Sequence, residues 1–126
     1  MQACKLTITT AVDGQKTEFS CQGELELSTF GAKLQYRQEN ALVTLIWEGE
    51  SVSIERKGDY TLKLLLQRGT RTIGSIGIGG NEGTVEVETH RVEYAVSKNS
   101  LLAMLHYDLI IGGEAQRMQL RISARI

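Results

Sequence analysis

The chain has 126 residues, with 14 basic and 15 acidic side chains and two cysteines. This length suits one domain, residues 1–126, that can bury a core without disulfides or a structural metal. The nearly balanced charge, without a run of like charges, gives no support for nucleic acid or an anionic membrane surface as a partner. The start of the chain lacks the pattern of a signal peptide and no apolar run is long enough to span a bilayer, so we expect a cytoplasmic protein.

Two strands are predicted at the start of the chain, over residues 3–12 and 16–27, because apolar and polar side chains alternate in both. A two-residue turn at residues 13–14 makes Cys4 and Cys21 diagonal neighbours on the inner face. Diagonal positions of paired strands are about 7–8 Å apart, further than the Cα atoms of a disulfide usually lie. We therefore expect two buried free thiols that pack as small apolar side chains.

The next turn is predicted at residues 30–31, where a glycine follows an aromatic residue. With this turn, Tyr36 stays on the inner face and Glu24 lies opposite Arg37 as an exposed ion pair. A further turn is expected at residues 39–40.

An arginine is predicted to face the interior in the strand that follows. A turn at residues 49–50 places Trp47 and, further from the turn, Arg56 on the inner face. Arg56 then stands at the end of its strand, just before a turn at residues 57–59. A buried arginine needs a partner or a water-filled space, because desolvating an unpaired charge is costly.

Six glycines occur between residues 69 and 83, where we expect a short strand at residues 72–78 and a loop at residues 79–83. A phosphate-binding loop would lead into the N-terminus of a helix, whose free amides meet the anion. The alternating segment 85–89 is instead typical of a strand. We therefore interpret the glycines as positions that let a barrel strand bend.

The inward positions change from odd to even numbers between Thr89 and Val92. A one-residue bulge near His90 or Arg91 keeps a common inner face and bends the strand.

The last segment is predicted to be a hairpin about residues 112–113, in which Leu105 faces Leu120 and Tyr107 faces Met118. Residues 101–105 are also good helix formers. We favour a strand, since a helix would leave the alternating arm that follows without a partner.

About ten strands with short connections and no proline predict an all-β fold, an up-and-down antiparallel barrel. Closure of the barrel also removes exposed strand edges.

Several motifs occur in a fixed order: an Arg-x-Gly turn, a leucine strand ending in glycine, a threonine-bearing strand, a Val-x-Val-x-Thr strand and a Leu-x-Tyr-x-Leu hairpin, at 56–58, 62–69, 72–78, 85–89 and 105–109. In these motifs the chain resembles the YwiB-like family of uncharacterised bacterial proteins. The resemblance implies a lipocalin-like, calycin-type barrel and no established activity. The chain departs from the family pattern at Ile76 and Ile78, where an aromatic and a threonine are usual, and then in a longer glycine-rich loop.

No arrangement of residues indicates catalysis, a metal or a cofactor. The expected pairing sets His106 beside Arg91 on the outside and His90 beside Tyr107, so the two imidazoles are expected to face different sides. No cluster of cysteine and histidine with ligand spacing is present, and no nucleophile has a base at a signature spacing. An enzymatic activity is therefore unsupported.

The inward polar and aromatic side chains predict a binding site for a small, largely apolar and possibly anionic ligand inside the barrel. In this hypothesis Arg56 meets the anionic end and tyrosine hydroxyls hydrogen-bond the ligand. The expected ligand-binding residues are Arg56, Tyr36, Tyr94, Tyr107 and Trp47. In the alternative, the barrel is filled by its own side chains, Arg56 caps an open end and the tyrosines reach water.

The outer face of the last strands predicts an interaction surface, with a homodimer as the simplest partner. Apolar residues there stand beside a row of arginines. The candidate interface residues are Leu102, Met104, Ile110, Arg117 and Arg121.

Overall fold

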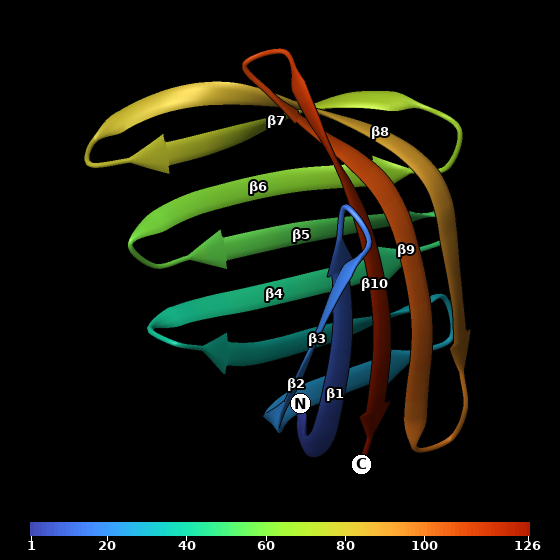
Figure 1. Ribbon diagram of the computed structural model, residues 1–126. Coiled ribbons are helices and arrows are strands. Elements are labelled where there is room, and N and C mark those ends of the chain that lie inside the picture. Colours follow the sequence, from blue (N-terminus) through green and yellow to red (C-terminus); the bar gives the residue numbers. More distant parts are fainter.

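The computed structural model describes all 126 residues as ten antiparallel strands that close into a barrel, in which each strand pairs with its neighbours in the chain and β1 pairs with β10 (Figure 1). This confirms the predicted all-β, up-and-down barrel. The strands are β1 (Gln2–Val12), β2 (Gln15–Ser28), β3 (Gly31–Gln38), β4 (Ala41–Glu48), β5 (Ser51–Lys57), β6 (Tyr60–Gln67), β7 (Arg71–Ile78), β8 (Asn81–Val96), β9 (Ser100–Ile111) and β10 (Glu114–Arg125).

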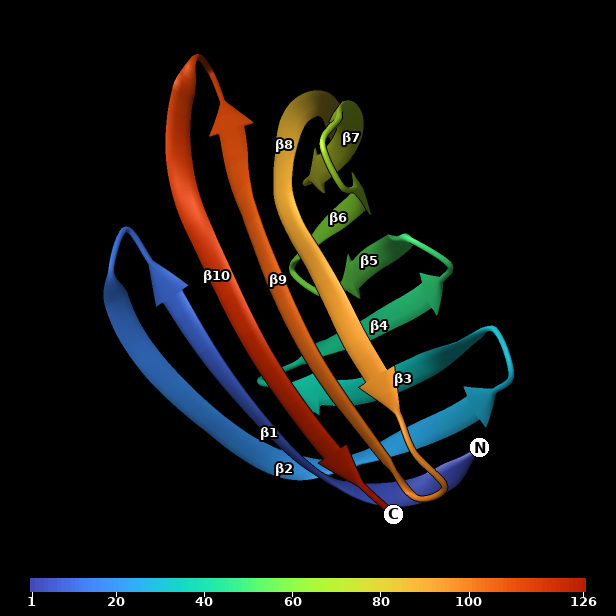
Figure 2. The same cartoon turned by 90° about the vertical axis from the view of Figure 1, so that its right-hand side faces the viewer.

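The strands of the barrel form two layers that cross at a steep angle. Strands β3 to β6 lie behind β8, β9 and β10, and the two long strands β2 and β8 bend from one layer into the other (Figures 1 and 2). In β8 the pairing with β9 shifts between Thr89 and Arg91, as the predicted bulge requires. In β2 the corner lies at Gly23, which pairs with both Cys4 and Tyr36. A Cβ atom at Gly23 would lie only 2.8 Å from the Gln35 carbonyl oxygen, so the bend needs glycine there.

The predicted registers hold for most hairpins. Leu105 pairs with Leu120 in the last hairpin, and residues 101–105 form a strand, not a helix. Both cysteines are free, as predicted, but only Cys4 is buried and Cys21 is partly exposed. Burial raises the pKa of each thiol.

Three turns differ from the prediction. The turn between β5 and β6 covers residues 58–59 instead of 57–59, because Lys57 still belongs to β5 and pairs with Thr61. Glu24 pairs with Gln35 instead of Arg37, because Gly31 already belongs to the paired strand β3 and the turn lies one residue earlier. Gly31 is needed there because β3 passes directly against the Trp47 carbonyl.

The glycine-rich loop is also shorter than predicted. Gly79 and Gly80 both have positive φ values, 57° and 83°, and together make a two-residue turn. Strand β8 therefore begins at Asn81, and residues 81–83 are paired instead of forming a loop.

The core lies inside the barrel and consists of 24 buried residues from all strands except β7. It includes the fully buried side chains of Leu34, Trp47, Val52, Leu66 and Leu105. Most of the interior is thus filled by side chains.

Candidate functional site

One inward row of side chains runs across the sheet from β3 to β7. The strand pairings place its members directly beside one another, in the order Tyr36, Val43, Arg56, Leu62 and Ile76. Tyr36 and Val43 are buried, whereas the last three are only partly covered. The row lies towards the end of the barrel formed by the turns β3–β4, β5–β6 and β7–β8, on the left in Figure 1.

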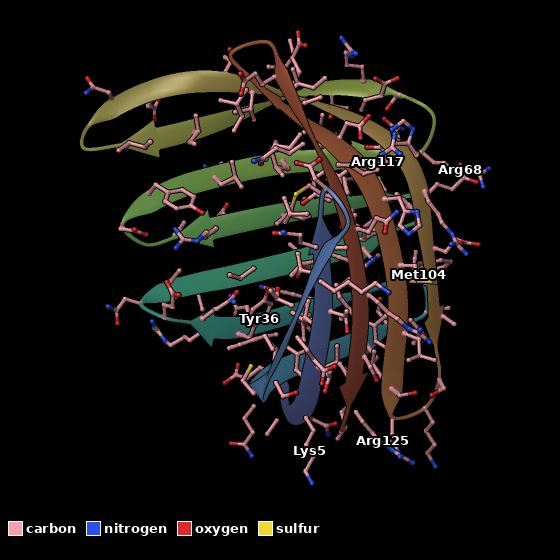
Figure 3. The ribbon with its side chains drawn as sticks, viewed as in Figure 1. Lys5, Tyr36, Arg68, Met104, Arg117 and Arg125 are labelled. Atoms are coloured by element: carbon pink, nitrogen blue, oxygen red, sulfur yellow. The ribbon has the colours of Figure 1, made fainter.

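Apolar side chains from β2 and β10 form the facing wall and are also only half-buried: Phe19, Cys21, Met118 and Leu120. The Phe19 ring lies 6.1 Å from the ring of Tyr36, so this wall contacts the row. Tyr36 is labelled at its place on β3 in Figure 3. We call this end of the barrel the open mouth, because its inward apolar side chains are only partly buried. We define it by Phe19, Met118, Leu120, Leu62 and Ile76, with Tyr36 and Arg56 as its polar members.

The opposite end of the barrel is closed by aromatic packing. Trp47 is fully buried, its ring lies 6.3 Å from that of Tyr94, and the Tyr94 hydroxyl donates a 2.8 Å hydrogen bond to the Gly49 carbonyl. The inward side chains of Val52, Leu66 and Val87 at this end are buried, whereas Leu27, Thr72, Tyr94 and Val96 at the rim are partly buried or exposed. The indole N–H of Trp47 has no hydrogen-bond partner, so Trp47 contributes apolar bulk there.

Arg56 is held at the open mouth by its own hairpin. Nη1 donates a hydrogen bond to the Tyr60 carbonyl and Nη2 donates one to Asp59 Oδ1, both at 3.0 Å. The guanidinium carbon also lies 3.8 Å from the centre of the Tyr60 ring, a cation–π arrangement. The hydrogen bond from Arg56 lowers the pKa of Asp59, so this carboxylate stays ionised.

Two tyrosines stand close together behind the mouth. Burial, and to a lesser degree the nearby Cys21, raises the pKa of Tyr36 to about 12. Burial and then the neighbouring Tyr36 raise the pKa of Tyr107, which is almost wholly buried. Both tyrosines therefore remain neutral hydrogen-bonding groups at any physiological pH.

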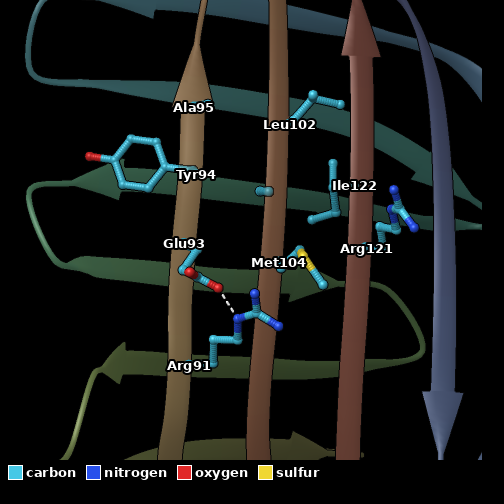
Figure 4. A pocket seen from close by; sticks show the side chains of 9 residues that line it. Arg91, Glu93, Tyr94, Ala95, Leu102, Met104, Arg121 and Ile122 are labelled. Carbon is cyan, nitrogen blue, oxygen red and sulfur yellow. Dashed lines mark ion pairs between the residues drawn. The ribbon is translucent and has the colours of Figure 1, made fainter.

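A second feature lies on the outer face of β8, β9 and β10. A depression of about 300 Å³ is bordered there by Leu102, Met104, Arg121, Arg91 and Glu93, with Arg91 and Glu93 forming an ion pair (Figure 4). Three of the predicted interface residues thus come together.

The other two predicted interface residues, Ile110 and Arg117, lie further along this face and do not border the depression. Arg117 Nε is 3.7 Å from Asp108 Oδ1.

The two histidines are placed differently from the prediction. His106 does pair with Arg91, but His90 also lies outside, where its Nε2 atom is 2.9 Å from Asp108 Oδ2. The extra residue of the bulge turns His90 out of the regular alternation. The expectation that the imidazoles face different sides was wrong.

The family model of a domain of unknown function, DUF1934, matches residues 3–122 of the chain. The chain belongs to this family. The crystal structure of the YwiB protein from Bacillus subtilis is similar, with a TM-score of 0.85 over 98% of this chain and 90% of that chain, at 16% sequence identity. No protein of curated function matches the chain. The structural similarity therefore supports the shared barrel fold, as the sequence resemblance implied.

In this DUF1934 chain the predicted ligand-binding residues do not form one site. Arg56, Tyr36 and Tyr107 lie at or behind the open mouth, whereas Trp47 and Tyr94 belong to the closed end. The ligand-binding role of all five remains a prediction. The structure contains no helix that is long and apolar enough to cross a membrane.

Sequence reasoning missed the half-exposed apolar side chains of the mouth as site residues. Alternation assigns Leu62, Ile76 and Met118 to the inner face, but it carries no information about their depth in the barrel. The available signal was the inward Arg56 in the same row, because a charged inward residue marks a position that water reaches.

Proposed function

We propose that this protein binds a small, largely apolar molecule with an anionic end at the open mouth of the barrel. The supporting observation is the contrast between the two ends. Inward apolar side chains from opposite walls, including Leu62, Ile76 and Met118, stay half-exposed at the mouth, whereas the other end is closed by Trp47 and Tyr94. Apolar walls with a few polar groups are typical of ligand sites.

Arg56 supplies the polar anchor in this proposal. A guanidinium has several N–H donors arranged in a plane, and here one goes to the Tyr60 carbonyl and one to Asp59. The Asp59 side chain is 81% exposed, so it returns to water at little cost when a ligand carboxylate takes its place. A carboxylate can then form a charge-assisted pair with Arg56.

The size of the ligand is limited by the core. The buried cluster behind the mouth includes Tyr36, Tyr107 and Leu105, which fill the space between the walls. A bound molecule would lie across the mouth against Phe19, Leu62 and Met118, instead of inside an enclosed chamber. A short-chain carboxylate fits this shape better than a large ring system.

The proposal can be tested with octanoate and octan-1-ol as probes, by calorimetric titration of the purified protein. We expect octanoate to bind at one molecule per chain and the alcohol to bind more weakly. Native mass spectrometry of freshly purified protein would reveal a molecule that is already bound.

Variants separate the apolar and the ionic parts of the site. Met118→Gln is expected to weaken octanoate binding by about tenfold, because a polar amide replaces the half-buried thioether. Arg56→Gln should remove the preference for octanoate over octan-1-ol. Ile73→Gln, at a 73% exposed position outside the barrel, is the matched control and should bind as the unmodified protein does. Binding that all three variants leave unchanged would place the ligand elsewhere and refute the proposal.

A further inference from the structure

The outer face of β8, β9 and β10 has an apolar centre that the barrel core does not require. Met104 lies between Glu93 of β8 and Arg121 of β10, and the next outward residue of β9, Leu102, lies between Ala95 and Ser123. The Leu102 side chain is 57% exposed. We call Ala95, Leu102, Met104 and Arg121 the β9 patch, and its depression has a volume of about 300 Å³.

One side of the β9 patch carries positive charge that no carboxylate of the chain neutralises. Arg91 is paired with Glu93, but Arg121, Arg125 and Lys5 take part in none of the ion pairs. Lys5 and Arg125 are direct cross-strand neighbours, and both lie at the lower end of the barrel in Figure 3. Like charges directly opposite each other are destabilising, so this pairing is unfavourable in the isolated protein.

We infer that the β9 patch docks a protein segment in which an apolar side chain is flanked by carboxylates. The apolar side chain enters the depression beside Met104, whose flexible thioether adapts to different shapes. The carboxylates pair with Arg121 and with the Lys5–Arg125 pair, relieving the repulsion between the two cations. The barrel has no free edge here, because β9 is paired on both sides, so the segment is recognised through side chains and not by strand addition.

The charge pattern favours this occupant over a second copy of the chain. A two-fold contact through the β9 patch would bring the same surface of both copies together. In either orientation, such a contact joins two surfaces that each carry Arg121 and Arg125 without an ion-pair partner, while the nearby Glu93 is already paired with Arg91. Two surfaces with an excess of the same charge disfavour the contact.

The test uses labelled synthetic peptides of about twelve residues, a length that spans the sheet when extended, and follows their fluorescence anisotropy. One peptide has two central leucines flanked by glutamates, a second has lysines in place of the glutamates, and a third has serines in place of the leucines. We expect only the first to bind, and its affinity to fall when the salt concentration is raised from about 50 mM to about 300 mM.

Variants locate the binding surface. Arg121→Gln and Met104→Gln should each weaken binding of the glutamate-flanked peptide by about tenfold. Arg68→Gln and Ile73→Gln, at exposed positions away from the patch, should leave it unchanged. Thermal unfolding by circular dichroism verifies that each variant is folded. If Arg121→Gln does not fold, Arg125→Gln takes its place in the test.

Any one of four binding results would overturn the inference. They are absence of binding by the glutamate-flanked peptide, equal binding of the lysine-flanked peptide, equal loss of binding in the Arg68→Gln control, and tighter binding to anionic vesicles or single-stranded DNA than to the peptide. A dimer in light scattering that Met104→Gln dissociates would also overturn it, in favour of a second copy. These outcomes are independent of octanoate binding at the open mouth.

Discussion

Arg56 illustrates how a charged side chain is accommodated on the inner face of a small barrel. Its side chain is 19% exposed, and its hydrogen-bond partners, Asp59 and the Tyr60 carbonyl, lie three and four residues away in the same hairpin. Local partners hold the guanidinium without a second charge inside the barrel. An ion pair with an exposed carboxylate contributes little stability. The inward position of Arg56 is therefore better explained by a role at the open mouth than by a contribution to stability.

Tyr36 and Tyr107 are expected to make the stability of the protein fall as the pH rises in the alkaline range. Folding raises the pKa of both, to about 12 for Tyr36. Above about pH 10 the unfolded chain loses these protons while the folded chain keeps them, so the unfolded state is favoured as pH rises. The stabilising effect of Tyr36 is complete below about pH 10 and is lost as the pH rises from about 10 to about 12, and that of Tyr107 is lost at still higher pH.

This predicts that the free energy of unfolding in urea falls between about pH 9 and about pH 11, by an amount on the order of 1–2 kcal/mol from Tyr36 alone. A variant carrying both Tyr36→Phe and Tyr107→Phe should show a clearly smaller fall over the same range. If the two proteins lose stability in parallel, the buried tyrosines are not responsible.

At the scale of the strand, close approaches between backbones decide where glycine is needed. The closest is at the start of β3, where a Cβ atom on Gly31 would lie 1.9 Å from the Trp47 carbonyl oxygen. That atom belongs to the backbone of β4 and cannot rotate away. By contrast, a Cβ on Gly83 of β8 would meet only the Ile76 side chain, at 3.7 Å.

We therefore predict that Gly31→Ala destabilises the protein by about 1–3 kcal/mol, as overpacking usually does, because β3 and β4 must move apart beside the buried Trp47. Gly83→Ala is the matched control and should change stability by less than about 0.5 kcal/mol. The measurement is the urea midpoint of each variant. Similar midpoints for both variants would contradict the close approach of β3 and β4.

For the whole molecule, the registers could be predicted wherever turn residues and alternation agree. The bulge was predictable because inward positions change parity between Thr89 and Val92. The position of the turn before β3 was not predictable. The sequence around Gly31 resembles a turn, but this glycine is needed inside β3, where β3 passes close to β4. The inward positions of the site residues were equally predictable. Their depth in the barrel was not, because it depends on which side chains close each end. The contact that closes one end, between Trp47 and Tyr94, joins residues far apart in the chain.

The simple order of the strands predicts that the position of the chain ends is not essential to the fold. All neighbours in the barrel are joined by short turns except β1 and β10, which pair over eight residues from Lys5 to Val12. The two termini lie near each other at one end of the barrel (Figure 2).

A circular permutant should therefore fold if Ile126 is joined to Met1 by a flexible linker of about six residues, enough to run back along the first residues of β1. New termini between Gly79 and Gly80 fall in an exposed turn, where no other atom packs closely against either residue. We expect the same far-ultraviolet circular dichroism and a melting temperature within about 10 °C of the original, since closing one short loop and opening another nearly offset each other. A chain ending at Ile111, by contrast, leaves the edges of β1 and β9 unpaired and should aggregate. A permutant that fails to fold would indicate that the β7–β8 turn is required for assembly, and that pairing order alone does not determine this barrel.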